Sequence, residues 1–200
     1  KKYKSNIKII GLKDDLRRIK QFGKICVNKD ILDFGCGWGN FLTSLKKTKS
    51  LSGIELREDC IGYLKKKRKK IFIEKNLKNL KKKFDVITLF HVLEHMPEQV
   101  KSLKKIKKYL KKKGKIIIEV PHANDFLLGL DNLKEFKFFT FWSEHLILHT
   151  YLSLKTILKV AGFKKIKISY FQRYSLNNHL GWIIKKKPGG HEFFKNITSK

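Results

Sequence analysis

The chain has 200 residues and carries 47 Lys and Arg against 17 Asp and Glu, a formal net charge of +30. This length suits one domain with a sizeable core, so we expect residues 1–200 to form a single domain. No apolar run approaches the ~20 residues that cross a bilayer. The three cysteines, Cys26, Cys36 and Cys60, include no C-x-x-C pair, which favours a reducing, cytoplasmic setting over a disulfide scaffold.

The excess positive charge fits nucleic acid, an acidic membrane surface or an anionic small molecule as partner. Lysine supplies nearly all of it, in runs such as 65–70 and 111–113 at predicted helix ends and exposed faces. A specific nucleic-acid surface more often uses arginine with interleaved aromatic residues. Compositional drift toward lysine is therefore the favoured interpretation of the charge.

The N-terminal third predicts a helix, a strand and a glycine-rich turn. Residues 14–22 carry apolar side chains at helical spacing. A short buried strand over 31–34 is followed by a three-glycine turn at 35–39, and a helix is expected from Asn40, as N-cap, to about Lys47. Glycine has no Cβ, so such a turn lets a ligand approach the backbone closely.

Strands and helices alternate through the middle of the chain. Strands are predicted over 51–55, 71–74, 85–90 and 114–121, and helices over 59–70 and 97–110. This alternation is typical of an α/β domain with a parallel sheet.

Periodicity fails between residues 121 and 150, a stretch rich in phenylalanine. We interpret it as an acceptor-site insertion because it leaves the carboxyl end of a strand, where open α/β sheets bind ligands. A loop covering a core edge is the alternative. A helix from Leu154 that stops at Gly162 and strands over 163–170 and 181–185 complete the expected fold.

Asp33 indicates which cofactor the turn binds. The dinucleotide fingerprint is G-x-G-x-x-G, whereas this chain has G-x-G-x-G with a carboxylate two residues before it. A carboxylate 4 Å from a pyrophosphate charge repels it by roughly 4 kcal/mol near a protein surface. The same carboxylate attracts the ammonium and sulfonium groups of S-adenosylmethionine (SAM), which has no phosphate.

Four blocks in order then resemble the class I SAM-dependent methyltransferases: the D-x-G-x-G-x-G turn, Glu55 at the end of the second strand, H-x-L-E-H at 91–95, and the strand 114–121. The resemblance implies a Rossmann-like, mostly parallel sheet of seven strands in the order 3-2-1-4-5-7-6, with strand 7 antiparallel and helices on both faces. It also implies SAM as cofactor and S-adenosylhomocysteine (SAH) as product. The cofactor-binding residues that it implies are Asp33, Gly35, Cys36, Gly37, Trp38, Gly39, Glu55, Leu56, Asn76, Leu77, Phe90 and His91.

Methyl transfer to a neutral hydroxyl needs a base, and the catalytic candidates are His91, His122 and His145. Core or loop roles remain the alternative for each. The candidates for binding the acceptor are Asn124, Arg173, Tyr174, Asn178 and His179. We expect no metal site, because the chain has no H-E-x-x-H motif and no clustered carboxylates.

The expected function is SAM-dependent methylation of a small, anionic acceptor. The tail from 172 to 191 resembles that of bacterial surface-polysaccharide methyltransferases, which implies an oxygen of a nucleotide-linked, phosphorylated or sugar precursor. One alternative is an RNA or protein methyltransferase that uses the basic surface, although no N-P-P-Y or D-P-P-Y motif follows the fourth strand. The other is a non-catalytic SAM-fold partner protein. The sequence leaves the oligomeric state open.

Overall fold

The structure is a computed structural model that describes residues 13–67, 71–142 and 145–189. The end of the helix predicted over 59–70 lies outside the described residues. The chain divides into two compact units: Lys1–Leu93 with Lys101–Glu119, and Glu94–Val100 with Val120–Lys200. The expected insertion at 121–150 falls wholly in the second unit, and the expectation of a single domain stays a prediction.

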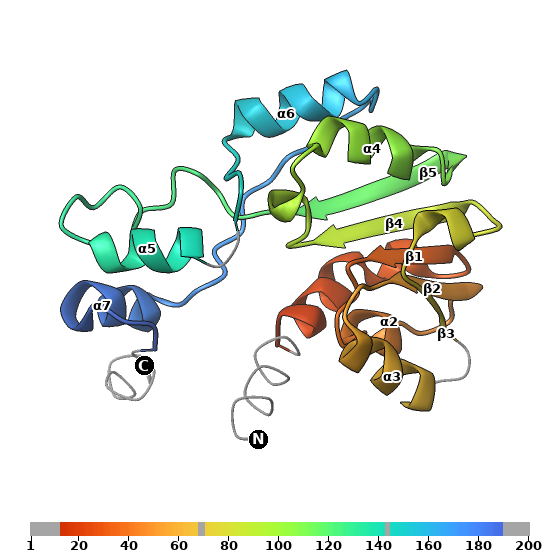
Figure 1. The fold of residues 1–200 in the computed structure, drawn as a ribbon, viewed down its shortest axis with the longest axis horizontal. Coiled ribbons are helices and arrows are strands. Elements are labelled where there is room, and N and C mark those ends of the chain that lie inside the picture. The colour runs from red at the N-terminus through yellow and green to blue at the C-terminus, as the bar shows by residue number, and fades with distance from the viewer. Residues whose placement is uncertain (1–12, 68–70, 143–144, 190–200) are drawn as a thin grey trace. The chain divides into compact units, whose positions relative to one another are not determined.

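A parallel sheet forms the first unit (Figure 1). Its strands are β1 (Asp30–Phe34), β2 (Ser50–Ile54), β3 (Ile71–Glu74), β4 (Phe84–Phe90) and β5 (Leu110–Glu119), in the order β3-β2-β1-β4-β5. The chain reverses its direction of travel across the sheet between β1 and β4, so this is the point where α/β sheets bind ligands. The predicted Rossmann-like α/β architecture is confirmed.

Short helices and turns connect these strands. Residues 13–22 are helical, and they are followed by η1 (Gly23–Cys26), α2 (Asn40–Ser44), α3 (Glu58–Lys67), η2 (Leu77–Asn79), η3 (Leu93–His95) and α4 (Gln99–Lys107). The core lies between the sheet and α2 and α3, which pack beside β2 and β3 (Figure 1). The strands of the sheet centre are buried on both faces, which is why they read as continuous apolar runs.

Two of the boundaries that differ from the prediction affect the turn and the sheet. The N-cap of α2 is Gly39 in the left-handed conformation, rather than Asn40, and the helix ends at Ser44. β5 begins at Leu110, whereas the lysine run after it was expected to end a helix. Lys111 belongs in the strand because its ammonium group binds Asp30 and Asp85, each at 2.7 Å.

Helices and connecting loops make up the second unit. It contains α5 (Lys134–Trp142), α6 (Tyr151–Val160) and α7 (Leu176–Lys185). Its small core is built around the buried Trp182 of α7, whose ring contacts Phe136 of α5 edge-to-face at 5.0 Å. Part of the stretch in which we found no periodicity is therefore helical.

The predicted seven-stranded sheet is wrong for the described residues, which form five strands and no antiparallel edge pair. The expected strand over 181–185 lies inside α7, whose buried residues Asn177, Asn178, Gly181 and Trp182 recur at helical spacing. The expected strand over 163–170 has alternating exposure but no strand pairing, and Lys165 has a φ of 55° that interrupts extended backbone. Alternating exposure shows that one side of a segment is buried, but a β-strand also requires hydrogen bonds to a neighbouring strand.

Candidate active site

The glycine turn after β1 has a conformation that other residues resist. Gly35, Gly37 and Gly39 have φ values of 77°, 52° and 68°. A Cβ on Gly35 would collide with the Val92 side chain, and one on Gly39 would collide with Leu64. The N–H groups of Gly35 and Cys36 both donate to the carbonyl of Ile54, at 2.8 and 3.0 Å. The end of β2 thereby fixes the start of the turn.

Glu55 holds the middle of the same turn. One carboxylate oxygen accepts from the N–H of Gly37 at 2.6 Å, and the other accepts from the N–H groups of Leu56 and Arg57 at 2.9 and 3.0 Å. A carboxylate has about four lone-pair positions, so about one remains for a further donor beside these three. Glu55 therefore shapes the turn as well as presenting a carboxylate at the carboxyl end of the sheet.

Asp33 is only 3% exposed and lies in β1, beside the neighbouring strand β4. It pairs with Thr88 across the two strands, and the Thr88 hydroxyl donates to its Oδ1 at 2.6 Å. Burial raises the pKa of Asp33 to about 7, although the hydrogen bond from Thr88 lowers it. The Asp33 carboxyl group therefore lies at the topological switch point of the sheet and has a pKa close to neutral pH.

The side chains of Trp38, Cys36 and Leu56, three further residues predicted to bind the cofactor, differ in their exposure and contacts. Trp38 meets Tyr63 edge-to-face at 5.4 Å, with the Arg57 guanidinium 5.7 Å from its ring. Cys36 is buried, and burial raises the pKa of its thiol far above the usual range. The side chain of Leu56 is 73% exposed.

Two residues predicted to bind the cofactor have side chains that make contacts inside the protein. The side-chain oxygen of Asn76 accepts from the N–H of Lys78 at 3.0 Å and so caps η2, while Leu77 is half-buried. The ring of Phe90 is buried against Phe41, with 5.0 Å between centroids, and has the Arg18 guanidinium above it at 4.4 Å. Phe90 therefore offers a ligand its backbone rather than its ring.

His91 directly follows β4 and has the left-handed conformation, with a φ of 55°. Its Nε2 lies 3.2 Å from Oε1 of Glu119, the last residue of β5. Glu119 also binds Arg17 at 2.7 Å and Arg18 at 2.8 Å. Burial opposes ionisation, but the hydrogen bonds from His91, Arg18 and Arg17 hold the pKa of Glu119 far below its usual range. His91 is thus anchored through a carboxylate that stays charged.

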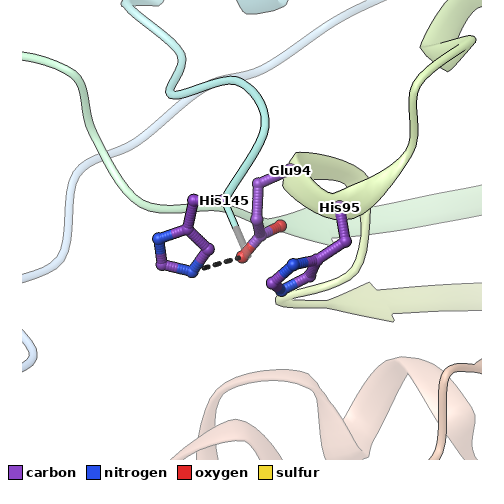
Figure 2. A group of neighbouring side chains, drawn as sticks. All are labelled: Glu94, His95 and His145. Carbon is purple, nitrogen blue, oxygen red and sulfur yellow. Dashed lines mark ion pairs between the residues drawn. The ribbon is translucent and has the colours of Figure 1, made fainter. Parts of the chain in front are cut away.

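The second unit brings together Glu94, His95 and His145 (Figure 2), which we call the Glu94–His95–His145 cluster. Glu94 is fully buried, and its Oε1 lies 4.0 Å from Nε2 of His145. The two imidazole rings are 5.0 Å apart. Sequence analysis named His145 but missed the cluster, because its two segments are far apart in the chain and carry no known spacing.

Two further histidines belong to this unit. His149 is 3% exposed, and burial lowers its pKa while the charge of Glu94 raises it. Its backbone forms a bridge with that of His122, whose ring meets Tyr170 edge-to-face at 5.2 Å.

The predicted acceptor-binding residues all belong to the second unit as well. Asn124 is exposed. Asn178 is buried in α7 and donates to the carbonyl of Gly189 at 3.4 Å, so its side chain serves the fold. The Nδ1 of His179 lies 3.0 Å from the carbonyl oxygen of Ser175, and the Arg173 guanidinium lies over the ring of Tyr174 at 5.2 Å.

A family model described as "Methyltransferase domain" matches residues 11–168. The chain belongs to this family. It is 31% identical over 137 residues to an uncharacterized protein of Methanocaldococcus jannaschii, covering 67% of this chain and 54% of that protein. It is 30% identical over 124 residues to a ubiquinone biosynthesis O-methyltransferase of Hydrogenovibrio crunogenus, covering 56% and 51%.

Among solved structures, a SAM-dependent methyltransferase of Archaeoglobus fulgidus superposes with a TM-score of 0.61 at 28% identity, covering 78% of this chain and 70% of that one. The predicted membership of the class I SAM-dependent methyltransferases is confirmed, and with it the expected SAM-type cofactor. This methyltransferase chain spans about half the length of the curated relatives it matches. Its described helices include none long and apolar enough to cross a membrane.

Proposed function

We propose that this chain transfers a methyl group from SAM to an oxygen atom of a small-molecule acceptor. The observation that carries the proposal is the bond between Glu55 and the glycine turn, in a chain whose residues 11–168 match the methyltransferase domain. The choice of oxygen is supported by the relatives of the chain that are named as O-methyltransferases in Hydrogenovibrio crunogenus and Saccharomyces cerevisiae.

In this proposal SAM lies at the carboxyl edge of the sheet. Asp33 balances the positive charge of the cofactor from within the sheet, Glu55 faces the ribose hydroxyls, and Trp38 covers the methionine part. The backbone of the glycine turn and of Phe90 and His91 completes the pocket. Leu56, Asn76 and Leu77 lie on the adenine side.

The reaction is an in-line displacement in which positioning contributes most, up to roughly 7–11 kcal/mol. A proton acceptor adds about 10²–10⁴-fold for a neutral hydroxyl. His91 and His145 both fit this role, since each lies beside a carboxylate that can orient the imidazole. His122 is the third candidate. Normal turnover in all three alanine variants would remove histidine base catalysis from the proposal.

For the acceptor, we propose an anionic molecule such as a nucleotide-linked, phosphorylated or sugar precursor of a bacterial surface polysaccharide. An anionic acceptor would fit the net charge of +30. Arg173 suits phosphate, because its guanidinium can bind two oxygens at once. Asn124, Tyr174 and His179 are the other polar candidates.

The test is a transfer assay with labelled SAM and three acceptor pools: nucleotide sugars, phosphorylated small molecules and total RNA. Label in a small-molecule oxygen supports the proposal. Label in RNA alone favours the RNA methyltransferase alternative. SAH binding without transfer to any pool favours a non-catalytic partner protein.

A further inference from the structure

We propose that Glu94, His95 and His145 bind one divalent transition-metal ion such as Zn²⁺. Their ligand atoms, one carboxylate oxygen and two imidazole nitrogens, all lie within 4.8 Å of one another. A tetrahedral ion with bonds of about 2.0–2.1 Å holds its ligands roughly 3.4 Å apart. Side-chain movements of about 1 Å would therefore close the cluster around an ion.

The donor set indicates the kind of ion. Imidazole nitrogen suits Zn²⁺, Co²⁺ and related metals, whereas Mg²⁺ and Ca²⁺ prefer sites made of oxygen atoms. Three protein ligands leave a coordination position open, as in catalytic rather than structural zinc sites. A divalent cation would also neutralise the negative charge of Glu94, a carboxylate with no exposed surface.

The two segments that carry the ligands are fixed to each other. Glu94 and His95 are neighbours in the η3 turn, and the Glu94 carbonyl accepts from the N–H of Leu146 at 2.9 Å and of Ile147 at 3.3 Å. These bonds hold the segment that follows His145 beside the turn (Figure 2). A site whose ligands are positioned in advance loses less entropy when the ion binds.

His149 supplies an independent observation. The Nδ1 of His149 lies 3.2 Å from the Ser153 hydroxyl oxygen, which lies 3.2 Å from the Thr150 carbonyl oxygen. In the tautomer in which Nδ1 donates to Ser153, Nε2 carries a lone pair, and this buried atom has no hydrogen-bond partner within the described part of the chain. Because Glu94 acts electrostatically on this ring, a cation bound at Glu94 would interact favourably with the lone pair.

The proposal that these residues bind a metal ion does not depend on the proposed methyl transfer. A role of the ion in catalysis does rest on that proposed function. An ion with an open position would take an acceptor oxygen and lower its pKa. With His145 as a ligand, His91 and His122 remain as proton acceptors.

The test is titration of the chelator-treated full chain with Co²⁺, followed by visible absorption and by competition with Zn²⁺. We expect one ion per chain, with no displacement by Mg²⁺ in the same concentration range. His95→Ala and His145→Ala change half-buried residues, and each should weaken Co²⁺ binding by about tenfold or more. Glu98→Gln, which alters an exposed carboxylate nearby, should leave the affinity unchanged.

Wild-type protein that gives no Co²⁺ absorption would overturn the proposal, as would equal affinities in the wild type and both histidine variants. SAH affinity measured on the same samples tests the methyltransferase pocket separately. Unchanged SAH binding in the variants would also show that loss of the metal does not reflect unfolding.

Discussion

The carboxylate of Glu55 accepts a hydrogen bond of 2.6 Å from the backbone N–H of Gly37. This contact joins the loops that follow β2 and β1, two neighbouring strands of the sheet. The turn that receives the cofactor is thereby shaped by the acidic residue expected to bind the same cofactor. Removing Glu55 should therefore damage the pocket in two ways, by losing a ligand contact and by loosening the turn.

Glu55→Ala should weaken SAH binding by about 1–3 kcal/mol, the usual effect of losing hydrogen bonds to a charged group. Titration calorimetry measures this directly. Glu58→Ala is the matched control, because Glu58 is an exposed carboxylate at the start of α3 that bonds to Lys75. Equal SAH affinities in the two variants would remove Glu55 from the pocket.

Gly35→Ala should lower the free energy of unfolding by about 2 kcal/mol or more, since a left-handed conformation costs most residues 1–2 kcal/mol and the new methyl group also meets Val92. Gly62→Ala is the control. Gly62 lies within α3, where an added Cβ meets nothing within 4 Å, so alanine should stabilise the helix by about 0.5–1 kcal/mol. Urea unfolding of both variants checks the two signs; destabilisation by Gly62→Ala and none by Gly35→Ala would contradict the described turn.

The contribution of Asp33 to the stability of the ligand-free protein should fall as the pH rises from about 4 to about 7. The folded state holds the proton on Asp33 up to its raised pKa of about 7, whereas the unfolded chain releases it near 3.8. The folded state binds more protons in this window, so the slope is negative, up to about 1.4 kcal/mol per pH unit. The difference between wild type and Asp33→Asn in urea unfolding at several pH values isolates this contribution; a pH-independent difference would refute it.

Glu119→Gln should destabilise the first unit by about 3 kcal/mol, because it removes the carboxylate charge that Arg17, Arg18 and His91 share in a partly buried site. The destabilisation should be fully present above about pH 5. The folded state lowers the pKa of Glu119, so the ionised carboxylate stabilises the protein until the pH falls below the usual pKa of this group. Thermal unfolding at pH 7 is the measurement, and Glu135→Gln on α5 is a control. An unchanged Tm in Glu119→Gln would show that the network contributes nothing.

The sequence predicts those features of the fold that depend on residues close to one another in the chain. Asp33, the glycine turn and Glu55 were found because strand ends and glycines leave a signature within a few residues. Lys111 was misread because its partners, Asp30 and Asp85, are distant in sequence. The helix α7 was misread because the short apolar run 181–185 does not distinguish strand from helix. The Glu94–His95–His145 cluster could not be predicted, since it depends on where the chain returns after β5.

The central claim is that the turn after β1 binds a sulfonium cofactor or its product rather than a phosphate-bearing dinucleotide. Titration calorimetry of the full chain with SAH and, in parallel, with NAD tests it most directly. The account predicts one SAH bound per chain, no measurable heat with NAD, and weaker SAH binding in Glu55→Ala. Binding of NAD in preference to SAH, or of neither ligand by folded protein, would contradict it.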